Sequence, residues 1–229
     1  MGNPRETRGD IASRLKGVFS DFWALFSFYL VILVICVIVF ALGQANHWID
    51  GLFVASRSTP WGVVTSLFIH SDASHLTMNL VGILSFLLIF SFTNYYFPSG
   101  EVASRVRFFI ATILATTVLS NVLWIIIANI GSIGASGLVY ASEGAVTGFC
   151  LLNFWDLYSE ARNSGAKGKK GVMLVNLLIF LAICAWMLFY TNSFLSYGSD
   201  VNVLIHGSSF ILAFILSIEW GNIRNLFNR

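Results

Sequence analysis

Six long runs of apolar residues constrain this 229-residue chain more than any other feature of its sequence. Each run is close to the roughly 20 helical residues that cross the hydrocarbon core of a bilayer. Charged residues make up only 10% of the chain, whereas soluble domains carry about 25%. A backbone inside lipid must satisfy its own hydrogen bonds, as a helix does. The sequence therefore predicts an all-α, polytopic membrane protein with six transmembrane helices. The predicted spans are Phe22–Leu42, Leu76–Phe97, Phe108–Ile130, Ser136–Trp155, Val172–Phe194 and Val201–Ile218.

The three cysteines predict neither a disulfide framework nor a metal site. Cys36, Cys150 and Cys184 all fall inside apolar runs, where a thiol behaves as a small buried hydrophobe. Their spacing matches no metal-binding pattern. We therefore expect no metal bound by these cysteines. The first apolar run is also too long for a cleaved signal peptide, so it predicts a permanent helix.

Basic residues gather on one side of the predicted serpentine of helices. Lys and Arg near the ends of membrane spans favour the cytoplasmic side. Of the 13 Lys and Arg residues, only Arg57 falls in an outer connection. This distribution predicts a multi-pass protein of the cell (plasma) membrane with both termini cytoplasmic. The other basic residues are Arg5, Arg8, Arg14, Lys16, Arg105, Arg107, Arg162, Lys167, Lys169, Lys170, Arg224 and Arg229.

The chain divides into three predicted parts. Residues 1–21 form a basic cytoplasmic arm, residues 22–221 the six-helix transmembrane domain, and residues 222–229 a short cytoplasmic tail. The first outer connection, Gly43–Ser74, is long and aromatic, so we expect it to lie in the membrane interface. The third outer connection, Gly131–Ala135, is short and rich in glycine.

Polar side chains recur at one depth of the predicted bundle. Even-numbered helices run from the outer face inward, so residues at their starts lie near that face. His75 and Asn79 begin the second helix, Ser136 begins the fourth, and His206 lies about two turns into the sixth. The orientation rests on basic residues alone, yet it brings these four polar residues to one level.

Ser136 is the candidate nucleophile. It stands in Gly134-Ala135-Ser136-Gly137, where a glycine-rich loop runs into a predicted helix. Glycine permits the backbone angles of a sharp turn, and the unpaired N–H groups at a helix start would stabilise an oxyanion. The alternative is an ordinary helix cap with small residues for close packing.

His206 is the candidate general base. A histidine inside a membrane span is costly and is therefore a candidate functional residue. The alternative is a structural hydrogen bond between helices. Its neighbours Gly207, Ser208 and Ser209 are small, which would allow the sixth helix to approach the fourth closely.

His75 and Asn79 are candidate hydrogen-bond donors to an oxyanion at Ser136. They are four residues apart and so share one helix face. The alternative is a helix cap with interfacial solvation. The nearby His70 is expected to be interfacial and structural.

No acidic residue is placed to orient His206 directly. Asp200 is six residues before His206 and points to a different helix face. Glu143 lies on the same face as Ser136, but roughly 10 Å deeper along the helix axis. We expect Glu143 to be a neutral, hydrogen-bonded structural carboxyl. A catalytic unit in this chain would therefore be a Ser–His dyad.

Together, these motifs resemble those of the rhomboid family, in its prokaryotic form with a six-transmembrane core. His75 and Asn79, with the upstream His70, resemble the family's HxxxN signature, and residues 134–140 resemble its GxSGxxY motif. His206 resembles the base on its last helix. The resemblance implies a six-transmembrane-helix rhomboid-like bundle that acts as an intramembrane serine protease without cofactor or metal. Its implied partners are transmembrane protein substrates and the lipid bilayer, with no nucleic acid.

The resemblance also implies a role for each matching residue. Ser136 would be the nucleophile and His206 its general base, later the acid that protonates the leaving amine. His75 and Asn79, with the backbone N–H of Ser136, would hold the oxyanion. Tyr140 would pack against the His206 ring and set its orientation.

The chain departs from the family pattern at two places. Trp61 is present, but Gly62 stands where the family often carries an arginine. Ser209 and Ala213 stand at the glycine positions of the last helix, which predicts close but looser packing.

Two other functions stay open on the sequence. One is a catalytically silent relative that binds transmembrane clients without cutting them. The other is a small transporter that uses Glu143 and His206 as a proton path. Inverted repeats or paired broken helices would favour the transporter, and the sequence shows neither.

Overall fold

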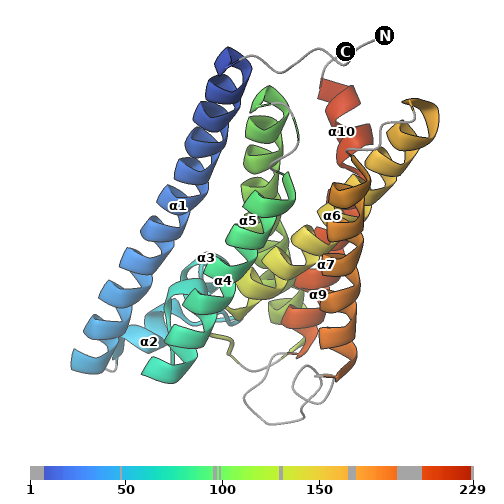
Figure 1. Ribbon diagram of the computed structural model, residues 1–229. Helices are drawn as coiled ribbons and strands as arrows, with labels where there is room; N and C mark the ends of the chain where they lie inside the picture. The colour runs from blue at the N-terminus through green and yellow to red at the C-terminus, as the bar shows by residue number, and fades with distance from the viewer. Residues whose placement is uncertain are drawn as a thin grey trace.

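The computed structural model describes residues 8–46, 48–94, 97, 99–128, 131–164, 169–189 and 203–227, and these are almost wholly helical. The long helices form a bundle (Figure 1). They are α1 (Arg8–Ala45), α4 (Ala73–Asn94), α5 (Ser99–Ile127), α6 (Ser136–Ser164), α7 (Lys169–Phe189) and α9 (Val203–Ile218). The short ones are α2 (Trp48–Phe53), α3 (Gly62–Thr65), the 3-10 helix η1 (Ser66–Phe68) and α10 (Trp220–Phe227). The predicted all-α architecture is confirmed for this part of the chain.

The predicted spans coincide with the long helices, but several helices extend beyond the apolar runs. Backbone hydrogen bonding does not stop where apolar side chains stop, so α1 already begins at Arg8. The described part of the predicted arm at 1–21 is therefore the start of the first spanning helix. The division into arm, domain and tail stays a prediction. The residues Arg5, Lys167, Arg229 and the connection Leu195–Asp200 lie outside the described residues.

Four of the described helices are long and apolar enough to cross a membrane, namely α1, α4, α5 and α7. The helix α9 is apolar but shorter, with 16 residues, and α6 carries too many polar and small residues to qualify by hydropathy. The bundle tolerates these polar and small residues because α6 is its central helix, packed against α4, α5, α7 and α9. Every residue from 141 to 150 is buried. A helix enclosed by protein needs no apolar outer surface.

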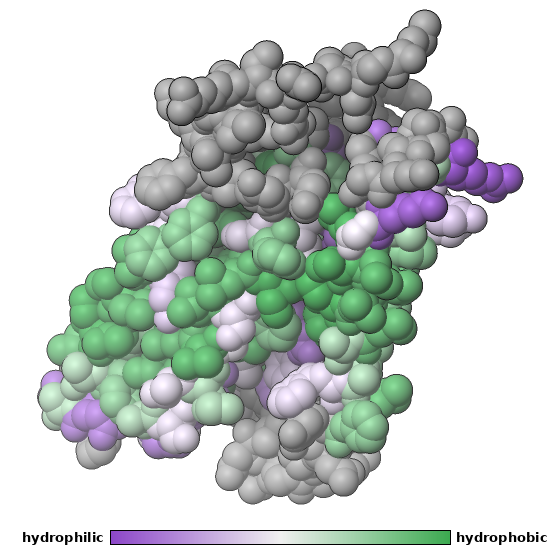
Figure 2. All heavy atoms as spheres, in the orientation of Figure 1, coloured by the Kyte–Doolittle hydropathy of each residue, from purple (hydrophilic) through white to green (hydrophobic). Residues whose placement is uncertain are grey.

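The surface of the bundle carries a band of hydrophobic residues across the middle of the visible face (Figure 2). Hydrophilic residues gather toward the two ends of this band. Large apolar side chains on α4 and α7 are exposed, among them Met78, Phe92, Leu178 and Trp186. Such a belt suits helices whose outer faces contact lipid rather than water.

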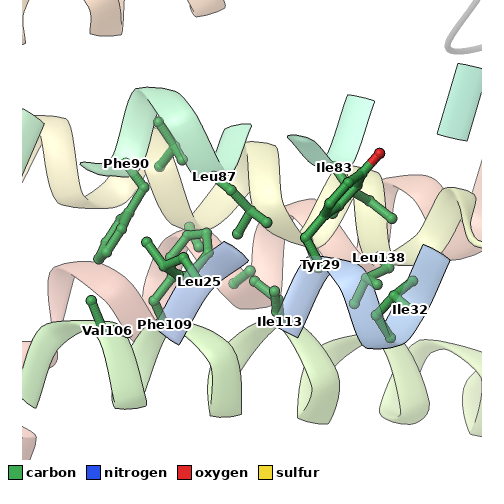
Figure 3. Close-up of a cluster of buried hydrophobic side chains, with 14 of the residues drawn as sticks. Leu25, Tyr29, Ile32, Ile83, Leu87, Phe90, Val106, Phe109, Ile113 and Leu138 are labelled. Carbon is green, nitrogen blue, oxygen red and sulfur yellow. The ribbon is translucent and has the colours of Figure 1, made fainter. Parts of the chain in front are cut away.

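Buried apolar side chains, most of them from α1, α4, α5 and α6, form the core of the bundle. Phe90 of α4 stacks on Phe109 of α5 with ring centroids 4.1 Å apart, and it meets Phe149 of α6 edge-on at 5.2 Å. Side chains of α1 close the same cluster. Figure 3 labels Leu25, Tyr29, Ile32, Ile83, Leu87, Phe90, Val106, Phe109, Ile113 and Leu138 of this cluster.

A buried arginine ties helix ends together at the end of the bundle away from Ser136. Arg105 of α5 is only 1% exposed. Its guanidinium donates to Glu101 at 2.8 and 3.1 Å, to Asn94 at 3.3 Å and to Asn153 at 2.5 Å. Asn153 donates in turn to Asn176 of α7 at 3.2 Å. Because a buried charge needs partners, this network holds α4, α5, α6 and α7 in one arrangement.

The first outer connection folds into α2, α3 and η1. Gly62 in this connection lies directly against the backbone of Val54 and Ala55. A Cβ on Gly62 would overlap the backbone of Val54 and Ala55, so the arginine expected from the family pattern cannot be accommodated there. Arg57 instead donates to the carbonyl oxygens of Ile125 and Ile126 at 3.2 and 3.0 Å. These carbonyls end α5, where a cation is favourable. The first outer connection is thereby fastened to the end of α5.

The helices α6 and α9 approach each other closely. A Cβ on Gly144 would overlap the backbone carbonyl of Phe210, and one on Gly148 would overlap that of Phe214. Ser209 and Ala213 are fully buried on the facing side of α9. The close packing of these two helices that the sequence predicted is therefore present, and Gly144 and Gly148 of α6 permit it.

Candidate active site

Ser136 and His206 lie in direct contact although 70 positions separate them in the chain. Ser136 is the first residue of α6, and its Oγ is 2.9 Å from Nε2 of His206. His206 is 8% exposed and Ser136 is half-buried, so the pair lies just inside the protein surface. In the described chain α9 begins at Val203, so His206 lies in the first turn rather than two turns into the helix. This distance permits direct proton transfer between hydroxyl and imidazole.

Tyr140 packs on the ring of His206. The two ring centroids are 4.2 Å apart with an interplanar angle of 31°. Tyr140 follows Ser136 by one helical turn, so both side chains reach His206 from the same face of α6. The tilted Tyr140 ring therefore lies against the imidazole that contacts Ser136.

A turn at Gly134 with positive φ leads into the start of α6. Gly134 has φ +105°, a backbone conformation that side chains disfavour. A Cβ on this residue would also lie 2.7 Å from Cε1 and 2.9 Å from Nε2 of His75, and 3.6 Å from Nδ2 of Asn79. The structure thus places His75 and Asn79 against the turn that carries Ser136. All five residues selected from the sequence meet in one place.

Asn79 has an unused hydrogen-bond donor. The side chain is 6% exposed, and its Nδ2 has no hydrogen-bond partner among the described residues. Burying an amide N–H without an acceptor costs about 1–3 kcal/mol. A donor held in that state beside the nucleophile turn is available to a group that arrives during a reaction.

His75 is not the cap of α4, which was the alternative explanation for it. Asp72 caps the helix instead, because its Oδ1 accepts the backbone N–H of His75 at 2.8 Å. That hydrogen bond is the main reason why the pKa of Asp72 is lowered, with a second from Ser71. Nδ1 of His75 lies 3.3 Å from the Ser71 hydroxyl, so the other ring nitrogen is directed toward Gly134.

The loop before Ser136 is held by backbone pairs to the first outer connection. Ser132 and Ala55 exchange two hydrogen bonds of 3.0 and 3.1 Å. The N–H of Gly134 donates to the carbonyl of Ser66 at 2.9 Å. The long outer connection therefore sets the position of the nucleophile loop as well as covering it.

His70 is the residue that sequence reasoning undervalued. It is 4% exposed, and its Nε2 accepts the backbone N–H of Ala135 at 3.3 Å. Burial lowers the pKa of His70 to about 4, and the nearby His75 adds to this effect. His70 is therefore neutral at pH 7 and able to accept this bond. The only signal in the sequence was its place upstream of the HxxxN pair, which does not reveal the contact with Ala135.

Glu143 is buried in α6, as its place in the sequence suggested. Its Oε1 has no hydrogen-bond partner among the described residues, so the expected hydrogen bond is not found at that oxygen. Asp200 lies outside the described residues. Within the described ranges, no group of three His, Cys, Asp or Glu residues could hold a metal ion.

Replacing Gly134 by alanine is expected to abolish most activity at this site. The substitution strains a backbone with φ +105° and drives a methyl group into the His75 ring. Backbone strain of this kind costs about 1–3 kcal/mol. We expect a lower midpoint in thermal unfolding together with loss of Ser136 reactivity toward a fluorophosphonate. The control is Gly51→Ala, because a Cβ there meets nothing within 4 Å. A fully reactive Gly134→Ala variant would contradict the geometry described for the turn.

Comparison with protein families gives one match. The sequence model described as Rhomboid domain matches residues 57–219. The matched region runs from the first outer connection through the nucleophile turn to the end of α9. A comparison with curated proteins found no match.

Proposed function

The chain belongs to the rhomboid family, and we propose that it is an intramembrane serine endopeptidase that works through a Ser136–His206 dyad. It hydrolyses peptide bonds in or near the transmembrane segments of other membrane proteins. The observation that carries the proposal is the 2.9 Å contact between Ser136 Oγ and His206 Nε2. A hydroxyl becomes a nucleophile when a base at this distance can take its proton.

The reaction proceeds in two halves on this geometry. Ser136 Oγ attacks the scissile carbonyl carbon while His206 Nε2 takes the hydroxyl proton. The protonated imidazole then gives that proton to the leaving amine as the C–N bond breaks, which leaves an acyl-enzyme. Water repeats the sequence with His206 as base and releases a carboxylate together with free Ser136.

The attack by Ser136 creates an oxyanion on the substrate, and several hydrogen-bond donors lie close to Ser136. The N-terminus of α6 offers backbone N–H groups and the positive end of its dipole. His75 and Asn79 lie against Gly134, two residues before the nucleophile. The buried, unpartnered Nδ2 of Asn79 supports a role as a donor that is used only when the oxyanion appears.

Topology supports the same proposal. The start of α1 and the helix α10 lie at one end of the bundle, away from the start of α6 (Figure 1). With the basic residues, this favours cytoplasmic termini in a plasma membrane and an active site near the outer face. Substrates are then cut near the outer surface of the bilayer.

The decisive experiment is labelling of the purified protein with a fluorophosphonate, followed by cleavage of a model transmembrane substrate in proteoliposomes. We expect the wild-type protein to be labelled at Ser136 and to cut the substrate. Ser136→Ala abolishes both signals. A folded wild-type protein that binds the substrate without labelling or cleavage would instead be a catalytically silent relative.

Replacing Asn79 by leucine is expected to lower kcat by about 100-fold while KM changes little. A lost oxyanion donor typically costs 10²–10³ in kcat, because it acts on the transition state alone. Leucine has nearly the same shape, and removing an unpartnered buried donor leaves stability equal or higher. Steady-state kinetics and thermal unfolding measure the two effects. Ser85→Ala is the control on the same helix, since its hydroxyl donates to the carbonyl of Val81 one turn earlier. Unchanged kcat in Asn79→Leu would remove Asn79 from the oxyanion site.

A further inference from the structure

His70 contacts both halves of the proposed active site. Its Nε2 accepts the N–H of Ala135, the residue before the nucleophile. Its ring meets the ring of His75 edge-on, with centroids 5.2 Å apart and an interplanar angle of 71°. One side chain thus contacts the nucleophile turn on one side and a candidate oxyanion donor on the other.

The hydrogen bond from Ala135 to His70 is one of several that hold the loop before Ser136. Ser132 is paired with the backbone of Ala55, and Gly134 with the backbone of Ser66. Ala135 is 1% exposed, so water does not replace its partner readily. Without His70 its N–H would be a buried donor with nothing to bind, directly beside Ser136.

The ring contact constrains His75 in a different way. Nδ1 of His75 lies near the Ser71 hydroxyl, and its opposite edge lies against Gly134. The His70 ring packs edge-on against it, so a rotation of His75 away from Gly134 requires His70 to move too. Moving His70 would in turn release Ala135. The two constraints are therefore coupled through a single imidazole.

We propose that His70 is a positioning residue that holds the Ala135 turn and the His75 ring in the geometry required for attack by Ser136. This inference rests on the proposed protease function. His70 contacts Ala135 and His75, so it acts on the reaction through the turn and the His75 ring. It must be a neutral acceptor at Nε2, with the ring proton on Nδ1.

The test compares His70→Met with His70→Gln in proteoliposomes. Methionine fills a similar space without a comparable acceptor, whereas the glutamine amide oxygen reaches the position of Nε2. We expect His70→Met to lower kcat about 100-fold with KM within about twofold, as for a small displacement of reacting groups. His70→Gln should recover at least about tenfold of that loss, because the acceptor for Ala135 is restored.

Two further readouts separate positioning from stability. The rate of fluorophosphonate labelling should follow kcat across the three proteins, while the unfolding midpoints of the two variants stay alike. Equal kcat in His70→Met and wild type overturns the proposal. An equal loss of kcat in His70→Met and His70→Gln, with equal unfolding midpoints, overturns it too. If His70→Met does not fold, a folded but inactive His70→Gln overturns it and an active one supports it. A wild type that neither labels nor cleaves refutes the protease function itself, which is a distinguishable result.

Discussion

Replacing His206 by alanine is expected to lower kcat by about 10⁴-fold or more, with little change in the stability of the fold. Without the imidazole, Ser136 has no base within 2.9 Å to take its proton. Serine and its base act as a unit, and removal of either one in a hydrolase costs up to about 10⁶ in kcat. The measurement is kcat on a transmembrane substrate in proteoliposomes, with thermal unfolding in parallel.

The double variant Ser136→Ala/His206→Ala provides the sharper form of this prediction. We expect it to be no slower than either single variant, because each single change already disables the dyad. A further loss in the double variant would mean that the two residues act independently. The control is Ser208→Ala on the same helix, because the Ser208 hydroxyl donates to the carbonyls of Leu204 and Ile205 in its own helix. It should keep activity within about twofold.

Replacing Gly144 by alanine is expected to damage both stability and activity. The added Cβ would overlap the backbone carbonyl of Phe210, so α6 and α9 must separate. Overpacking of this kind costs about 1–3 kcal/mol. A displacement of about 1 Å between Ser136 and His206 costs on the order of 100-fold in rate. Denaturant titration in detergent and kcat on the same samples measure the two losses.

The matched control for Gly144 is Gly171→Ala on α7. A Cβ at Gly171 meets nothing within 4 Å, so the same chemical change there carries only the gain in helix propensity, about 1 kcal/mol. If both alanine variants behave alike, the close approach of α6 to α9 does not set the geometry of the dyad. The prediction also separates packing from chemistry, because Gly144 lies two turns away from Ser136.

Much of the fold could be predicted because lipid permits few alternatives. A long apolar run in a chain with few charges has to be a helix, and the basic residues order the connections. The hydropathy pattern was weakest at α6, because the polarity that a helix tolerates depends on which helices surround it. The structure explains this, since α4, α5, α7 and α9 surround α6 and leave it little contact with lipid. The ends of the helices could not be predicted closely, as the start of α1 at Arg8 shows.

The candidate site was predicted residue by residue, but not its contacts. Ser136, His206, His75, Asn79 and Tyr140 stood out because each polar type is costly or unusual at its place in an apolar chain. The sequence could not reveal that Gly144 and Gly148 of α6 lie against the backbone of Phe210 and Phe214 of α9. A contact of this kind depends on which helix faces meet, which no local sequence pattern states.

By itself, the sequence determined the helical class and the identity of the polar residues worth testing. Those properties follow from composition and order along the chain, because the cost of a polar group in lipid applies residue by residue. Only the tertiary structure decided that Ser136 and His206 are 2.9 Å apart, that Asn79 keeps an unpartnered donor, and that His70 supports Ala135. These contacts join residues far apart in sequence, so they exist only once the helices have packed.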